Sequence, residues 1–104
     1  PFEVSVQVDG AALLSGDPAR VRQEQDRVVA DITARVAAQA PGRHAAIVFA
    51  YGSSERAADG DRMAALITER LTSGAFQGTL MKAYHELVAG DRGTSISFEI
   101  YFDG

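Results

Sequence analysis

A continuous apolar run from Ala45 to Tyr51 is the feature that most restricts how this chain can fold. The run does not alternate between apolar and polar residues, which is the pattern of a strand covered on both sides or central in its sheet. We therefore expect residues 45–51 to form the central strand. Gly52 to Ser54 follow directly, and these small residues are expected to end the strand and begin a loop.

Three further segments have features of strands. Residues 2–9 and residues 95–102 alternate between apolar and polar side chains, as expected for strands with one buried face. The apolar spacing of residues 80–88 suits a helix or a strand, but the turn-rich residues 89–93 favour an extended segment. We expect residues 80–88 to pair with residues 95–102 as a hairpin.

Two helices are predicted between the first three strands. Asp17 is a natural N-cap, Pro18 suits the first helical position, and Pro41 with Gly42 ends the first helix. One stripe of that helix is apolar and consists of Val21, Val28, Val29, Ile32 and Val36. The second helix is expected to follow a polar loop that includes Asp59 and Gly60, with Asp59 as its cap, and to end near residues 73–74. Its apolar positions are Met63, Leu66, Ile67 and Leu71.

The elements therefore have the order β-α-β-α-β-β. This order predicts one α+β domain over residues 1–104, a two-layer sandwich in which a four-stranded mixed sheet has two helices mainly on one face. A hydrophobic content of 46% in 104 residues is enough for one continuous core.

Composition excludes several classes of partner. The formal net charge of -4 argues against binding to a nucleic-acid backbone or to an anionic membrane surface, because both depend on clustered Lys and Arg. The chain has no cysteine, so disulfides and thiolate metal sites are excluded. No apolar run approaches the roughly 20 residues that span a bilayer, so we expect no membrane insertion by this segment. The compartment and the oligomeric state stay open, and a homo-oligomer is compatible with the sequence.

Neither a metal nor a cofactor is expected. His44 and His85 are distant in the sequence, and neither has an acidic residue at metal-ligand spacing. We expect His44 to be exposed at the start of a strand and His85 to be partly packed within one. The loop after Tyr51 matches neither a dinucleotide fingerprint nor a phosphate-binding P-loop.

The leading candidate site is the loop that joins the buried strand to the second helix. This position commonly holds ligand groups in α/β domains, and the N-terminus of a helix favours a carboxylate or a phosphate. We expect Tyr51, Ser53, Glu55 and Arg62 to form a ligand site there. The alternative is structural: Gly52 and the serines only turn the chain, while Arg62 is only solvated.

Several short stretches carry a family resemblance. They are residues 8–13 (VDGAAL), residues 50–53 (AYGS), Arg62, residues 82–86 (KAYHE) and residues 97–100 (SFEI). Together with the element order, they resemble the OmpA-like domain, a peptidoglycan-binding module of bacterial envelope proteins. The resemblance implies that an Asp after the second strand and an Arg on the second helix grip a diaminopimelate side chain. Ser53 stands at the Asp position, Arg62 stands at the Arg position, and Glu55 is the acid that would replace the Asp.

The resemblance implies a non-catalytic binding or assembly module of the bacterial cell envelope. Its expected partner is peptidoglycan or another envelope protein, the latter contacted through an exposed sheet edge. The alternative function is enzymatic. Pro1, followed by a strand, a helix and a strand, resembles the opening of the tautomerase superfamily, which implies that the Pro1 amine acts as a general base.

Overall fold

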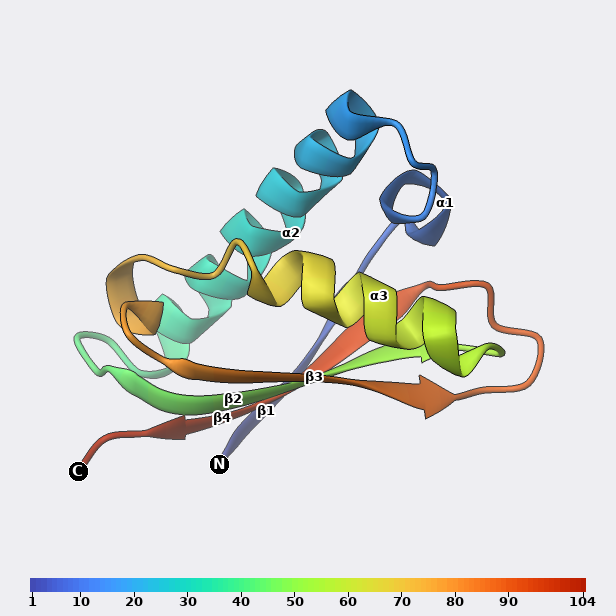
Figure 1. Ribbon diagram of the computed structural model, residues 1–104. Helices are drawn as coiled ribbons and strands as arrows, with labels where there is room; N and C mark the ends of the chain where they lie inside the picture. The colour runs from blue at the N-terminus through green and yellow to red at the C-terminus, as the bar shows by residue number, and fades with distance from the viewer.

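The computed structural model describes all residues 1–104 and contains two layers, a sheet and a helical layer (Figure 1). The elements are β1 (Phe2–Gln7), α1 (Gly10–Leu13), α2 (Pro18–Gln39), β2 (Ala45–Ser54), α3 (Ala57–Thr68), the 3-10 turn η1 (Gly74–Phe76), β3 (Leu80–Leu87) and β4 (Ser95–Phe102). None of the helices has the length and apolarity needed to cross a bilayer.

The four strands form one mixed sheet in the order β1-β4-β2-β3. β2 pairs in parallel with β3 and antiparallel with β4, and β4 pairs antiparallel with β1. The predicted α+β class, the β-α-β-α-β-β order of the main elements and the interior position of β2 are therefore confirmed. The extended form of residues 80–88 is also confirmed.

The expected hairpin between the last two strands is wrong, because β2 lies between β3 and β4. The connecting loop crosses the end of β2 and is bonded to it: Val88 N donates to Ser54 O over 3.0 Å, and Glu55 N donates to Asp91 O over 2.6 Å. β4 can then enter between β1 and β2. There it forms ladders with a strand on each side, which a simple hairpin at the sheet edge would not provide.

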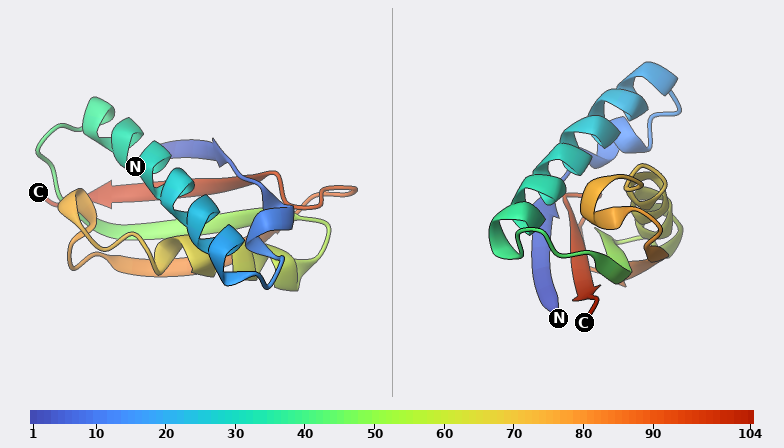
Figure 2. Two further views of the ribbon diagram at one scale, coloured as in Figure 1. Left: turned by 90° about the horizontal axis from the view of Figure 1, so that it is seen from above. Right: turned by 90° about the vertical axis from the view of Figure 1, so that its left-hand side faces the viewer.

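Both long helices cover the same face of the sheet (Figure 2). α3 packs on β2 and β3, whereas α2 packs against β1 and α1. Asp17 caps α2 by accepting from Ala19 N, and Pro18 occupies its first turn, as predicted. Between the layers lies one core, whose fully buried members include Val28, Ile32, Val36, Val48, Met63, Ile67, Ile96, Phe98 and Ile100.

The boundary between β2 and α3 differs from the prediction. β2 continues through Ser54, and α3 begins at Ala57 and ends at Thr68, so the connecting loop is only two residues long. Gly52 is not a strand breaker: a β-carbon there would overlap the carbonyl of Gly60, so the glycine lets α3 lie directly on β2. Asp59 lies within the first turn of α3 rather than capping it.

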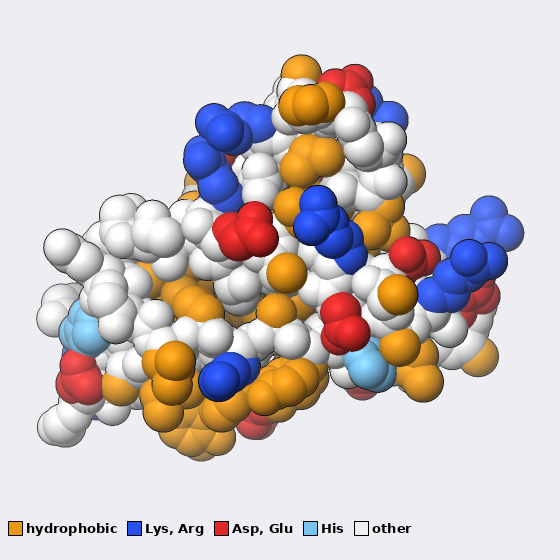
Figure 3. All heavy atoms as spheres, in the orientation of Figure 1, with side chains coloured by type: hydrophobic (Ala, Val, Ile, Leu, Met, Phe, Trp, Pro, Cys, Tyr) orange, Lys and Arg blue, Asp and Glu red, His pale blue; other side chains and the backbone are white.

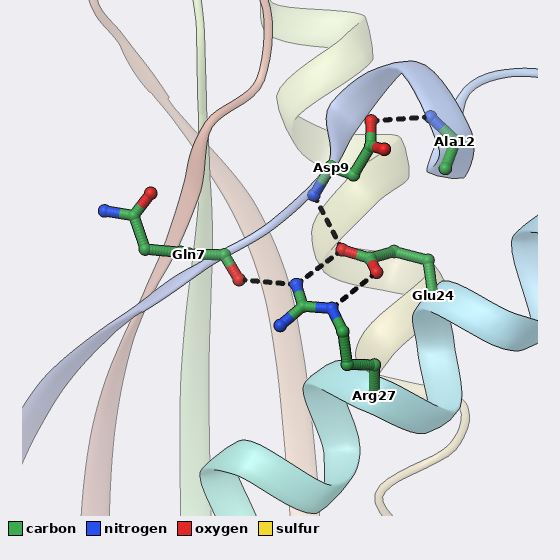
Figure 4. A network of polar contacts seen from close by, with 5 residues as sticks. All are labelled: Gln7, Asp9, Ala12, Glu24 and Arg27. Carbon is green, nitrogen blue, oxygen red and sulfur yellow. Dashed lines mark hydrogen bonds and ion pairs between the residues drawn. The ribbon is translucent and has the colours of Figure 1, made fainter.

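The segment after β1 contains the short helix α1 and is fixed by a polar network (Figure 4). The Glu24 carboxylate accepts from both Nε and one terminal nitrogen of Arg27, over 2.7 and 2.6 Å, and from Asp9 N over 2.6 Å. Arg27 also donates to Gln7 O over 3.0 Å. Burial opposes ionisation of Glu24, but the bonds from Arg27 and Asp9 together hold its pKa below the ordinary value.

Candidate functional site

At the junction of β2 and α3, the predicted site residue Ser53 already has a partner within the chain. Ser53 is buried, and its hydroxyl donates to Asp91 Oδ2 over 2.5 Å. Asp91 also accepts from Gly93 N over 2.7 Å, and these two bonds hold its pKa below the ordinary value. The loop between β3 and β4 therefore brings its own carboxylate to the position where the sequence suggested an external ligand.

The other predicted site residues do not meet in one pocket. Tyr51 lies in β2 and stacks on Tyr84, on the face of the sheet that α3 does not cover. Arg62 is exposed on α3, and Glu55 is exposed in the turn before that helix. Because the sheet separates Tyr51 from α3, the structure does not bring Tyr51 and Arg62 together.

Each histidine contacts an acidic side chain. His44 is partly exposed before β2 and lies between Asp103 and the Gln77 carbonyl, and the hydrogen bonds to Gln77 and Asp103 raise its pKa above the ordinary value. His85 Nδ1 lies 2.9 Å from Asp61 Oδ1, which joins β3 to α3 at the sheet edge. No group of three histidine, aspartate or glutamate side chains is arranged to hold a metal ion.

Pro1 lies at one end of the sheet beside a shallow depression of about 690 Å3. The side chains around it include Glu3, Arg43 and Tyr101. This places charged groups of both signs near the chain's first residue. It does not place a second acid–base group in a defined hydrogen bond with Pro1.

The uncovered face of the sheet, here called the open face, has the most distinctive arrangement of side chains. Its members are Glu3, Ser5, Ile47, Phe49, Tyr51, Leu80, Lys82, Tyr84, Glu86, Ser97, Glu99 and Tyr101. In the orientation of Figure 1 this face points downward, and Figure 3 shows hydrophobic side chains gathered along that lower side of the molecule.

Four aromatic rings from three strands form a cluster on the open face. The ring centroids of Phe49 and Tyr84 are 6.2 Å apart, and those of Tyr51 and Tyr84 are 5.6 Å apart, both stacked. Tyr101 meets Phe49 edge-on at 5.9 Å. Leu80 extends the cluster and is 53% exposed, and Tyr84 is 43% exposed. A contiguous apolar surface of this kind is typical of an interaction site.

A cross-strand row connects this cluster to the acidic side of the open face. Lys82 of β3 lies opposite Phe49 of β2, Phe49 lies opposite Glu99 of β4, and Glu99 lies opposite Glu3 of β1. The chain has five ion pairs, and none of them includes Glu3, Lys82 or Glu99. The two carboxylates are therefore opposite each other, and neither forms an ion pair within the chain.

Tyr51 joins the aromatic cluster to these acids. Interaction of its hydroxyl with the Glu99 carboxylate, together with burial, raises the pKa of Tyr51 to about 12. Tyr51, Glu3 and Glu99 line a shallow groove of about 740 Å3, together with Ser5, Ser97 and Glu86. The groove is thus lined by the aromatic side chain of Tyr51 and by three carboxylates.

Sequence reasoning singled out Tyr51 but not the rest of this face. One signal was present: Tyr101 is an aromatic residue at a position that the alternation of residues 95–102 assigns to the side away from the core. Phe49 belongs to the apolar run that predicts a buried strand. Tyr84 belongs to residues 80–88, whose spacing suits a helix or a strand. The side chains of the cluster come together because β2 lies between β4 and β3. The predicted hairpin would instead have placed β3 beside β4.

Comparisons with protein-family models, with curated proteins and with solved structures give no match for this chain.

Proposed function

We propose that this chain is a non-catalytic binding or assembly module that acts through the open face of its sheet. The observation that carries the proposal is the aromatic cluster of Phe49, Tyr51, Tyr84 and Tyr101 on a face that no other element covers. Aromatic rings contribute much of the energy of protein interfaces, because they bury a large area with few rotatable bonds.

The polar contacts favour binding over catalysis. Ser53 donates to Asp91 rather than to a histidine, and His85 contacts Asp61 at the helical side of the sheet edge. A nucleophile would need a base within hydrogen-bond reach and a third group that orients the base. The open face instead offers aromatic, hydroxyl and carboxylate groups, which recognise a partner without reacting with it.

Site-specific cross-linking in cells tests this function without assuming the partner. The full chain is produced with a photo-reactive amino acid at Tyr84 on the open face or, as a control, at the exposed Arg22 of α2. We expect a discrete cross-linked species from position 84 and none from position 22. Absence of a cross-link at position 84, or equal cross-linking at both positions, would contradict the proposal.

We extend the proposal to the bacterial cell envelope, with a peptidoglycan fragment or an envelope protein as the partner. Support comes from the resemblance of residues 8–13, 50–53 and 82–86 to the OmpA-like domain. Because Ser53 is bonded to Asp91, a diaminopimelate headgroup would have to contact the exposed Glu55 and Arg62, which lie just before α3 and on α3 and so form a second surface apart from the open face. Titration of the labelled protein with a diaminopimelate-containing muropeptide tests this: shifts at Glu55 and Arg62 support it, and no shifts refute it.

A further inference from the structure

The acidic side of the open face lacks an internal counter-charge. Glu3 and Glu99 are directly opposite in the antiparallel pair of β1 and β4, an arrangement in which like charges destabilise a sheet. Lys82 is two strands away from Glu99, across β2, and forms no ion pair. No ion pair within the chain offsets the repulsion between these two charges, whereas a cation from another molecule would relieve it.

The groove beside these acids suits one particular kind of cation. Tyr51 lines this groove together with Glu3 and Glu99, and the Tyr84 ring, which stacks on Tyr51 outside the groove, extends the aromatic surface. A guanidinium or an ammonium group can contact an aromatic face and donate to carboxylates at the same time. Apolar neighbours of that group would contact Phe49 and Leu80 farther along the face.

We propose that the partner of the open face is a positively charged protein segment, with an Arg or Lys side chain held over Tyr51 between Glu3 and Glu99. This inference rests on the proposed function and specifies the partner's chemistry. The open face carries three carboxylates, from Glu3, Glu86 and Glu99, against the single ammonium of Lys82. Its charge is complementary to a cationic partner.

The same charges disfavour a second copy of the chain as the occupant. Two copies placed face to face would bring six carboxylates together with two ammonium groups, because each open face contributes three acids and one lysine. The aromatic cluster alone would suit such a dimer, since isologous contacts are the commonest in oligomers. The excess of negative charge would oppose it.

The test uses a short synthetic peptide rich in arginine and leucine, and a matched peptide in which citrulline replaces every arginine. Nuclear magnetic resonance titration of the full chain is expected to show shifts around Glu3, Tyr51 and Glu99 with the arginine peptide. The citrulline peptide is expected to bind about tenfold more weakly, the loss of about one ion pair. Glu3→Gln and Glu99→Gln should each weaken binding of the arginine peptide by a similar factor.

A matched control is Glu69→Gln, which removes one exposed carboxylate that forms no ion pair and follows α3 on the helical side. Its affinity for the arginine peptide should stay within about twofold of the unmodified chain. Equal affinity for the arginine and citrulline peptides would overturn the inference. Equal losses of affinity for the arginine peptide in Glu69→Gln and Glu99→Gln would also overturn it.

Two outcomes separate this inference from the proposed function. If position 84 cross-links to another protein in cells but the arginine peptide does not bind, the binding module stands and its cationic partner is refuted. If sedimentation shows a dimer of the chain that Tyr84→Ser dissociates, a second copy occupies the open face and the inference is likewise overturned.

Discussion

The two faces of the sheet use alternate residues of the same strands for different purposes. In β4, Ile96, Phe98 and Ile100 are buried beneath the helical layer, whereas Glu99 and Tyr101 belong to the open face. The covered face holds the core, and burial there supplies the main driving force for folding. The open face holds the aromatic cluster, and no element of the chain covers it. The comparison separates residues that specify the fold from residues that are available for a partner.

The two sides also differ in how they treat charge. On the helical side, the buried Glu24 is neutralised by Arg27 and accepts from the Asp9 backbone. On the open face, Glu3 and Glu99 are opposite each other and have no cation. The buried charge on the helical side is thus paired within the chain, whereas the two opposed carboxylates of the open face form no ion pair.

The largest expected effect on stability comes from substituting two neighbouring residues of β4 that point to opposite faces of the sheet. Ile100→Ala should lower the free energy of unfolding by about 2–5 kcal/mol, because it leaves a cavity in the core. Tyr101→Ala should cost about 1 kcal/mol, mainly the edge-on contact with Phe49. Urea denaturation of both variants measures the difference. Equal losses would mean that the two faces do not differ in their contribution to stability.

A smaller effect is expected where α3 approaches the covered face most closely. Gly52→Ala should destabilise the protein by roughly 1–3 kcal/mol, because the added methyl group would meet the Gly60 backbone. Ser97→Ala is the matched change on the open face and should stay within about 0.5 kcal/mol of the unmodified chain. Thermal unfolding of both variants checks this. An unchanged melting temperature for Gly52→Ala would contradict the direct contact of α3 with β2.

The ion pair of Glu24 with Arg27 predicts a contribution to stability that depends on pH. Glu24→Gln should lower the free energy of unfolding by about 1.5 kcal/mol at pH 7, because it removes charge-assisted bonds from Arg27. The folded-state pKa of Glu24 lies below its ordinary value of 4.5, so this contribution is complete above about pH 4.5 and is lost as the pH falls through the lowered pKa. Urea denaturation across this range should show the two proteins converging in acid. A constant difference down to pH 2 would contradict the assignment.

The smallest expected effect has the opposite sign. Glu99→Gln should raise the free energy of unfolding by about 0.2–1 kcal/mol at low salt, because it removes the repulsion from Glu3 and keeps the size of the side chain. Added salt should reduce the gain, since it screens exposed charges. A loss of stability at low salt would show that the Glu99 charge serves the fold.

Periodicity was enough to predict most of the fold. The alternation of residues 2–9 and 95–102, the cap at Asp17 and the apolar run at Ala45 each depend on local physics, and each gave the correct element. The strand order was not predictable in the same way. A hairpin is the default for adjacent strands, and the insertion of β4 depends on the distant bonds that the loop around Asp91 makes to the end of β2.

The candidate site was harder to predict than the fold. Gly52 and Ser53 had the composition of a ligand loop, but their small size serves the contact with Gly60 and the bond to Asp91. Both partners are distant in the sequence, so no local pattern could reveal them. The aromatic cluster likewise arises from register between strands, which sequence spacing does not specify.

Hydroxyl-radical footprinting of the full chain, in living cells and after purification, tests the central claim most directly. The account predicts that Tyr84 and Tyr101 are oxidised readily in the purified protein and protected in cells. His44, a partly exposed residue before β2 and away from the open face, should react equally in both samples. Equal oxidation of Tyr84 and Tyr101 in cells and in purified protein would show that nothing covers the open face, and would contradict the account.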